Sequence, residues 1–114
     1  MPAIGFITPL LPGKTDTDRV AMTSCWRGER KEAYEGSRRR LGITREATFI
    51  QQTPNGDVAV VYWEADDVDA ALKGMATSQD PFDKWFRDHV REVHGLNVED
   101  GFPPPEQVMD FRAS

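Results

Sequence analysis

The feature that most constrains this chain is a pair of apolar segments within residues 44–65, joined at Asn55-Gly56. Both residues tolerate positive φ, which a tight hairpin turn requires, so the pattern predicts two antiparallel β-strands. A two-residue or four-residue loop centred on this dipeptide sets one register. In that register the facing pairs are Gln51 with Val60, Ile50 with Val61, and Phe49 with Tyr62.

Both faces of this hairpin carry apolar side chains, because residues alternate between the two sides of a strand. One face holds Thr48, Ile50, Ala59, Val61, Trp63 and Ala65, and the other holds Ala47, Phe49, Gln51, Val60, Tyr62 and Glu64. A sheet that is apolar on both sides needs a cover on each. One layer of helices in so short a chain covers only one side. We therefore expect a second subunit or a ligand on the other.

Composition indicates one domain, residues 1–114, with ordinary globular values of 39% hydrophobic and 29% charged residues. The formal net charge of -5 argues against nucleic acid and anionic membranes as partners. Cys25 is the single cysteine, so no intramolecular disulfide forms. Residues 1–11 lack a basic leader, and no segment reaches the roughly 20 apolar residues of a membrane span. We expect a cytoplasmic protein.

The remaining elements follow from turn and cap residues. Residues 3–8 predict a short strand, and one long helix is expected from Thr15 or Asp16 to about Arg40, ended by Gly42. A short helix follows Asp66-Asp67, and Asp80-Pro81 begins another that runs to His94 and ends at Gly95. A proline-rich connector at residues 102–106 then leads to a final strand at residues 107–112.

This order predicts a ferredoxin-like α+β fold, a βαββαβ antiparallel sheet with helices on one face and an extra helix before the last strand. The face with Trp63 is assigned to the helices because it is the more apolar. The opposite face, with Phe49, Gln51, Tyr62 and Glu64, would line the interior between two copies of the chain. We therefore expect a homodimer.

Several short motifs carry a resemblance to a known group. They are Pro12-Gly13-Lys14, Glu32-Ala33, Gly42-Ile43 leading to Glu46 and Phe49, Asn55-Gly56-Asp57, and residues 78–83. Their order over residues 3–95 is similar to that of a bacterial family of uncharacterised function in the dimeric α/β-barrel superfamily. This superfamily includes antibiotic-biosynthesis monooxygenases, muconolactone isomerases and haem-degrading proteins. The resemblance implies the ferredoxin-like fold and dimerisation, and allows cofactor-independent monooxygenation or isomerisation.

Three side chains are the main candidates for chemistry. His89 shares the apolar face of its helix with Trp85 and Phe86, and imidazole exchanges protons near neutral pH, so it is either a general acid/base or a hydrogen-bonded core residue. Tyr62 would donate a hydrogen bond to a substrate carbonyl or fill the interface. Lys14, in a loop after a strand, would meet an anionic ligand or remain a solvated loop residue.

Further ligand contacts are assigned to Gln51 and Glu64 on the face opposite Trp63, and to Glu46 if its side chain points inward. No metal site is expected, because His89 and His94 lack the His-Glu-x-x-His spacing, and no cofactor is expected. We predict a protein that binds a small organic molecule between sheet and helices or between subunits. The alternatives are a monooxygenase or isomerase of the dimeric α/β-barrel type, and a purely structural dimer without a ligand site.

Overall fold

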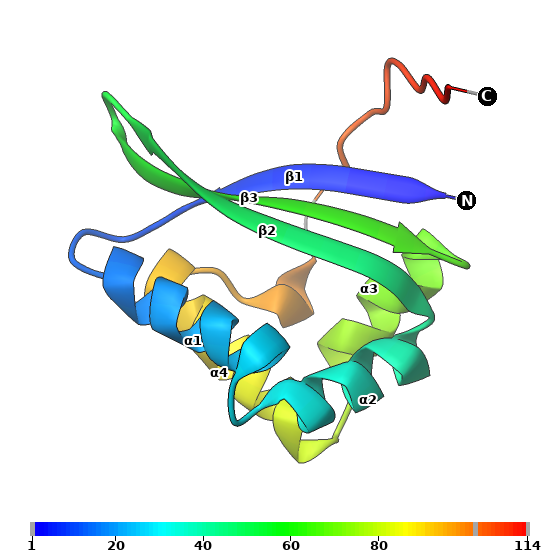
Figure 1. The fold of residues 1–114 in the computed structure, drawn as a ribbon, viewed down its shortest axis with the longest axis horizontal. Helices are drawn as coiled ribbons and strands as arrows, with labels where there is room; N and C mark the ends of the chain where they lie inside the picture. Colours follow the sequence, from blue (N-terminus) through cyan, green and yellow to red (C-terminus); the bar gives the residue numbers. More distant parts are fainter. Residues whose placement is uncertain (1, 102, 114) are drawn as a thin grey trace.

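A three-stranded antiparallel sheet with four helices on one side makes up the fold of the computed structural model, which describes residues 2–101 and 103–113 (Figure 1). The strands β1 (Ala3–Pro9), β2 (Ile43–Thr53) and β3 (Gly56–Ala65) are ordered β1-β3-β2. The helices are α1 (Thr15–Arg27), α2 (Lys31–Leu41), α3 (Val68–Thr77) and α4 (Pro81–His94), followed by the short 3-10 helix η1 (Val98–Asp100). No described helix is long and apolar enough to cross a membrane.

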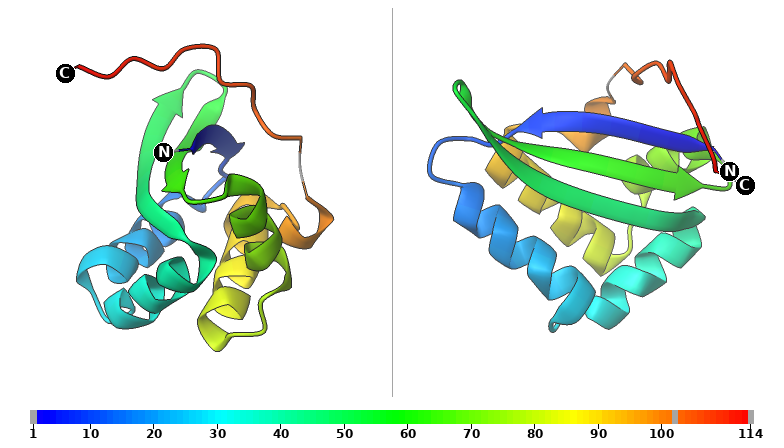
Figure 2. Two further views of the ribbon diagram at one scale, coloured as in Figure 1. Left: turned by 90° about the vertical axis from the view of Figure 1, so that its right-hand side faces the viewer. Right: turned by 45° about the horizontal axis from the view of Figure 1, so that its top comes forward.

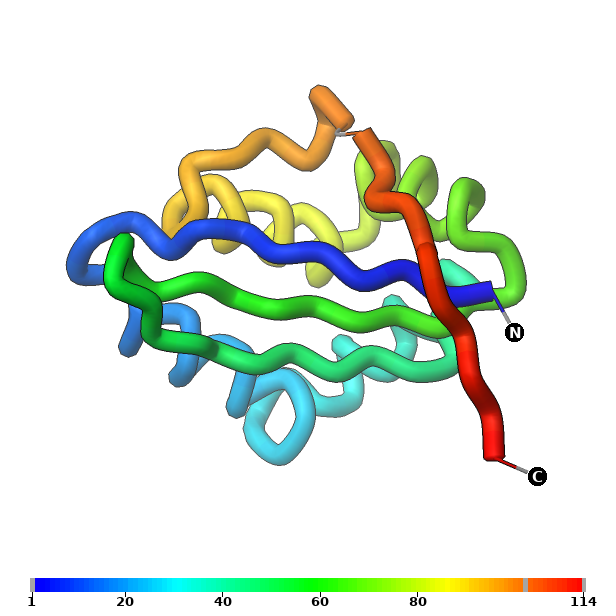
Figure 3. The backbone as a smooth tube through the Cα atoms, turned by 90° about the horizontal axis from the view of Figure 1, so that it is seen from above, coloured from blue at the N-terminus to red at the C-terminus, as the bar shows by residue number. Residues whose placement is uncertain are grey.

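The helices form one layer beneath the sheet (Figure 2). Viewed from above, α1 and α2 lie along the β2 edge, whereas α3 and α4 lie along the β1 edge (Figure 3). The opposite face of the sheet has no helix against it among the described residues. The α+β class and the placement of all helices on one face are therefore confirmed.

The hairpin is confirmed, but its predicted register is wrong by two residues. Val60 faces Phe49 and not Gln51, because the turn lies at Pro54-Asn55, one position earlier than expected. Proline with its fixed φ suits the first central position of a turn, and in this turn Gly56, the residue after Asn55, has a positive φ of 120°. A shift of two residues keeps every side chain on its predicted face.

The face with Trp63 packs on the helices, as predicted. Trp63 is 2% exposed and Ala65 is fully buried, and both belong to the main core cluster with Ile4 of β1 and Met75 of α3. On the open face, Ile7 and Phe49 remain 64% and 61% exposed. The sheet is thus covered on one side and bare on the other, although both sides are apolar.

The single long helix predicted from Thr15 or Asp16 to Arg40 is wrong, because the chain breaks between α1 and α2. Gly28 has an extended backbone, with φ −129° and ψ −154°. After this break the backbone N–H of Arg30 donates to the carbonyl of Ser24, and the Arg30 guanidinium donates to the Ser24 hydroxyl. These bonds turn the chain back, so α2 begins in a new direction.

The two later helices begin and end where the sequence predicts. The side chain of Asp67 accepts a hydrogen bond from the backbone N–H of Ala70 in α3, and that of Asp80 accepts one from Phe82 in α4. Gly95 follows α4 with φ 69°, in the left-handed region that favours glycine.

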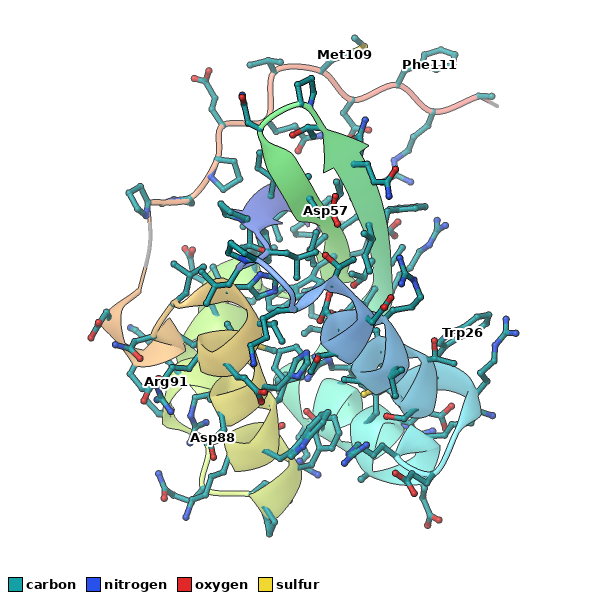
Figure 4. All side chains as sticks on the ribbon, turned by 90° about the vertical axis from the view of Figure 1, so that its left-hand side faces the viewer. Trp26, Asp57, Asp88, Arg91, Met109 and Phe111 are labelled. Carbon is teal, nitrogen blue, oxygen red and sulfur yellow. The ribbon has the colours of Figure 1, made fainter. Side chains whose placement is uncertain are left out.

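The final strand predicted at residues 107–112 is wrong. Residues 103–113 form no strand and run across the open side of the sheet, over the end of β3 (Figure 3). Met109 and Phe111 project away from the helices and are 77% and 81% exposed (Figure 4). Consecutive prolines favour an extended chain without ladder hydrogen bonds, so the described sheet has three of the expected four strands. Phe102, the first residue of the predicted connector, lies outside the described residues.

Candidate functional site

A cavity of about 460 Å³ lies between the helix side of the sheet and the helices. Its walls are mainly apolar and come from every layer of the fold: Phe6, Val61, Trp63, Leu72, Phe86 and Val90 are among them. It extends to η1 and to Pro103 and Pro105 of the tail.

A histidine–aspartate pair lies in the cavity wall. Nε2 of His89, on α4, is 2.8 Å from Oδ1 of Asp18, on α1. Both residues are buried, with exposed fractions of 6% and 2%. The ring of Trp85 stacks on the imidazole with 5.5 Å between ring centroids and an interplanar angle of 16°. The pair therefore joins two helices and holds the imidazole in a fixed orientation.

One oxygen of this pair has no partner. Oδ2 of Asp18 is buried and accepts no hydrogen bond from the described residues. A buried acceptor without a donor costs roughly 1–3 kcal/mol. Since Asp18 lines the cavity, a donor on a bound molecule would remove this cost.

Glu46 forms a second polar cluster at the cavity wall. Its carboxylate accepts hydrogen bonds from the hydroxyl of Tyr34 at 2.5 Å, from Nε of Arg38 at 2.7 Å and from Nε1 of Trp63 at 2.9 Å. The Arg38 guanidinium also lies over the rings of Tyr34 and Phe86, 4.7 Å from each ring centre. The strand β2, the core tryptophan and α2 are thus joined by one buried carboxylate.

The cluster around Glu46 sets the charge of its members. Burial alone would raise the pKa of Glu46, but the charge of Arg38 and the hydrogen bonds from Arg38, Tyr34 and Trp63 outweigh it and hold this pKa below its ordinary value. Burial and the adjacent Glu46 carboxylate raise the pKa of the Tyr34 hydroxyl, which stays protonated. Glu46 is therefore an ionised structural acceptor, and both of its carboxylate oxygens already accept hydrogen bonds.

His94 marks the other end of the cavity, near η1. Its Nδ1 is 2.8 Å from the carbonyl oxygen of Pro9, and its Nε2 is 3.5 Å from the hydroxyl of Thr8. A carbonyl only accepts, so Nδ1 carries the proton. Both ring nitrogens of His94 therefore serve to connect α4 with β1.

Of the six predicted site residues, the structure places His89 and Glu46 at this cavity. Lys14 precedes α1 and forms an exposed ion pair with Glu92, with Nζ 3.3 Å from the carboxylate. Tyr62, Glu64 and Gln51 lie on the open face of the sheet, as the alternation of side chains along the strands predicts. There the Tyr62 hydroxyl donates to Glu64 at 2.9 Å, which raises the pKa of Tyr62.

Sequence reasoning missed Asp18, Tyr34 and Arg38 as members of these clusters. A signal for Asp18 was present, because it precedes Ala21, Met22 and Cys25 at helical spacings of three, four and seven. Extending that inner row toward the start of the helix would have placed a carboxylate inside. Among the described residues, no three His, Cys, Asp or Glu side chains lie close enough together to hold a metal ion.

The chain matches no protein-family model and no curated protein sequence. The site is therefore interpreted from its own residues.

Proposed function

We propose that this protein binds a small, mainly apolar organic molecule in the cavity between its sheet and its helices. The observation that carries this proposal is a cavity of about 460 Å³ whose apolar walls include one buried polar pair, His89 and Asp18. Small-molecule sites are commonly concavities of about 300–1,000 Å³ with few, well-placed polar groups. The unpartnered oxygen of Asp18 supports the same reading, since a ligand donor would satisfy it.

We also propose that two copies of the chain associate through their open sheet faces. Val60, on the central strand β3, lies between Ile7 of β1 and Phe49 of β2 in the sheet register. These three side chains form an apolar row, and its outer members are exposed in the single chain. A purely structural dimer would use this same face, so it is the cavity that distinguishes a ligand-binding protein from that alternative.

Binding of N-phenyl-1-naphthylamine, an uncharged dye that fluoresces in apolar sites, tests the ligand proposal. We expect saturable fluorescence with one dye molecule per chain. Val90→Phe places a ring in the cavity wall and should weaken binding by about tenfold, which corresponds to about 1.4 kcal/mol. The matched control is Val20→Phe, because Val20 is a helical valine that is 69% exposed.

Circular dichroism would confirm that both variants are folded. Equal dye affinity in Val90→Phe and the unchanged protein would place the dye elsewhere and count against the cavity. Absence of saturable binding would favour the purely structural dimer.

A further inference from the structure

We propose that His89 and Asp18 form an acid/base pair that takes the proton from the hydroxyl of a neutral ring compound, such as a phenol, bound in the cavity. This inference rests on the proposed small-molecule site and specifies its ligand class. His89 is the catalytic residue, since it would touch the reacting proton. Asp18 is a positioning residue that acts through the imidazole.

The geometry assigns a separate task to each imidazole nitrogen. With Asp18 ionised, its carboxylate only accepts hydrogen bonds, so Nε2 of His89 carries the proton of the 2.8 Å bond. This leaves Nδ1 as the basic nitrogen. No described residue forms a hydrogen bond with Nδ1, and His89 lines the cavity. The nitrogen that can take a proton is thus the one not already used by the protein.

The polar atoms of this pair define what the ligand must offer. Nδ1 of His89 and the unpartnered Oδ2 of Asp18 are both acceptors. A ligand that pairs with Nδ1 has to donate a hydrogen bond, and a ligand with only carbonyl or ether oxygens would leave this nitrogen without a partner. The donor is therefore a hydroxyl or an amine.

The charges around the cavity argue against an anionic ligand. The titratable side chains in its described wall are Asp18 on α1, Glu46 on β2, and His89 and His94 on α4, and no lysine or arginine is among them. Glu46 is already paired with Arg38, and both nitrogens of His94 are engaged. A carboxylate or phosphate would therefore meet negative charge without a facing cation.

The wall also favours a flat ring. Phe6 and Trp63 meet edge to face, with 6.0 Å between their ring centroids, and Phe86 lies on the opposite, helical side of the cavity. Aromatic rings attract one another in offset or edge-to-face contacts beyond the area that they bury. A hydroxylated aromatic ring combines this surface with the donor that the acid/base pair requires.

The proposed step is a single proton transfer. The O–H bond of the ligand breaks, its electron pair stays on oxygen, and a new N–H bond forms at Nδ1 of His89. The imidazolium then carries a positive charge beside both the Asp18 carboxylate and the new phenolate. Asp18 stabilises the imidazolium and holds its ring in place, as a carboxylate does in other acid/base pairs.

Binding of 4-nitrophenol tests this proposal, because its anion absorbs visible light and its neutral form does not. The spectrum is recorded well below the pH at which free 4-nitrophenol ionises, with protein in excess. We expect a severalfold increase in the anion band on binding. His89→Gln should abolish the increase, and Asp18→Asn should shift its appearance to higher pH.

The matched control is Asp16→Asn, the same substitution two residues earlier in α1. The side chain of Asp16 is 91% exposed and pairs only with Arg19 in the described structure, so the anion band should be unchanged. In the unchanged protein, the ¹⁵N signals of the His89 ring should move to the imidazolium position when 4-nitrophenol is added. This measurement does not depend on the folding of any variant.

Displacement of N-phenyl-1-naphthylamine separates binding from proton transfer. If 4-nitrophenol displaces the dye without an anion band, or fails to displace a dye that binds, the acid/base inference is overturned and the ligand site stands. If benzylamine displaces the dye and 4-nitrophenol does not, Asp18 is a cation site and the inference is equally overturned. If the dye itself does not bind, the proposed function fails as well.

Discussion

Glu46 illustrates how a single buried charge can be stable inside so small a protein. Its side chain is 9% exposed, and Arg38 is 5% exposed. Taking two charges out of water costs several kcal/mol per ion, so such a pair is tolerated only where further hydrogen bonds use the remaining donors and acceptors. Tyr34 and Trp63 provide these bonds to Glu46, whereas Nη2 of Arg38 is buried without a partner among the described residues. The carboxylate is therefore bound to its neighbours more tightly than an average ion pair.

Glu46→Gln should destabilise the protein by about 3–5 kcal/mol, because it leaves the Arg38 charge buried without a counter-charge. Urea unfolding followed by circular dichroism measures the loss. The control is Glu64→Gln, the same substitution at a carboxylate of the open face that also accepts a tyrosine hydroxyl. A similar, small effect of both substitutions would show that the cluster contributes little to stability.

The pH dependence of stability should reveal the same cluster. Arg38 and the three hydrogen bonds hold the pKa of Glu46 below its ordinary value of 4.5 against the effect of burial. A folded-state pKa that is lower than the unfolded one stabilises the protein above the unfolded value, and this stabilisation is lost as the pH falls through the folded value. Urea midpoints between pH 7 and about pH 3 should therefore fall more steeply for the unchanged protein than for Glu46→Gln. Parallel profiles would contradict this assignment.

Individual residues also show what a sequence can reveal about a site. His89 was predictable because its helix repeats apolar residues at spacings of three and four, and a polar residue in such a row stands out. Its partner Asp18 was hidden, because acidic residues in the first turn of a helix are readily explained by the helix dipole. Arg38 was hidden in the same way, as one of three basic residues in a last turn. In both cases, the role depends on a residue of another element.

At the scale of elements, the break between α1 and α2 shapes the cavity. The break turns α2 away from the line of α1, which brings Arg38 beneath β2 and leaves Asp18 opposite α4. Glycine is required at the break for a steric reason. A Cβ at Gly28 would lie 2.7 Å from Cα of Ser24, a contact that real side chains do not make.

Gly28→Ala should therefore destabilise the protein by about 1–3 kcal/mol, as expected when backbone has to shift to admit a methyl group. Gly36→Ala provides the matched comparison. Gly36 lies within α2, and its Cβ would come no closer than 3.5 Å to Nη1 of Arg40. Alanine there should stabilise α2 by about 0.5–1 kcal/mol. Thermal unfolding of the two variants should shift in opposite directions, and equal shifts would refute the steric explanation.

The elements that were predictable are those determined by local chemistry. The starts of α3 and α4 follow from capping aspartates, and the hairpin faces follow from alternation along the strands. The prediction of a final strand at residues 107–112 failed because alternation of apolar residues is not sufficient for a strand. The segment must also reach an available sheet edge, and its backbone N–H groups must be free to bond to that edge. Pro103-Pro104-Pro105 directs the chain across the sheet before such an edge is reached.

At the scale of the whole molecule, the open face of the sheet is the surface on which the proposed dimer depends. Ile7, Val60 and Phe49 form a row across all three strands, and the tail that crosses the same side adds exposed Met109 and Phe111 (Figure 4). Large exposed apolar surfaces of this kind mark interaction sites. In a two-fold dimer each residue of the row occurs twice in the interface, so one substitution in the row alters the interface at two positions.

Val60→Asp should separate the proposed dimer and leave the fold intact. An unpaired carboxylate buried at the interface costs at least about 2 kcal/mol, and two copies raise the dissociation constant by about a thousandfold. Val61→Asp, the next residue along β3, points to the helices and packs on the core, so it should unfold the chain instead. Sedimentation measures the assembly, and circular dichroism measures the fold. If Val60→Asp remains a dimer, the subunits associate through a different surface, whereas dissociation with an unchanged spectrum identifies the bare face of the sheet as the interface.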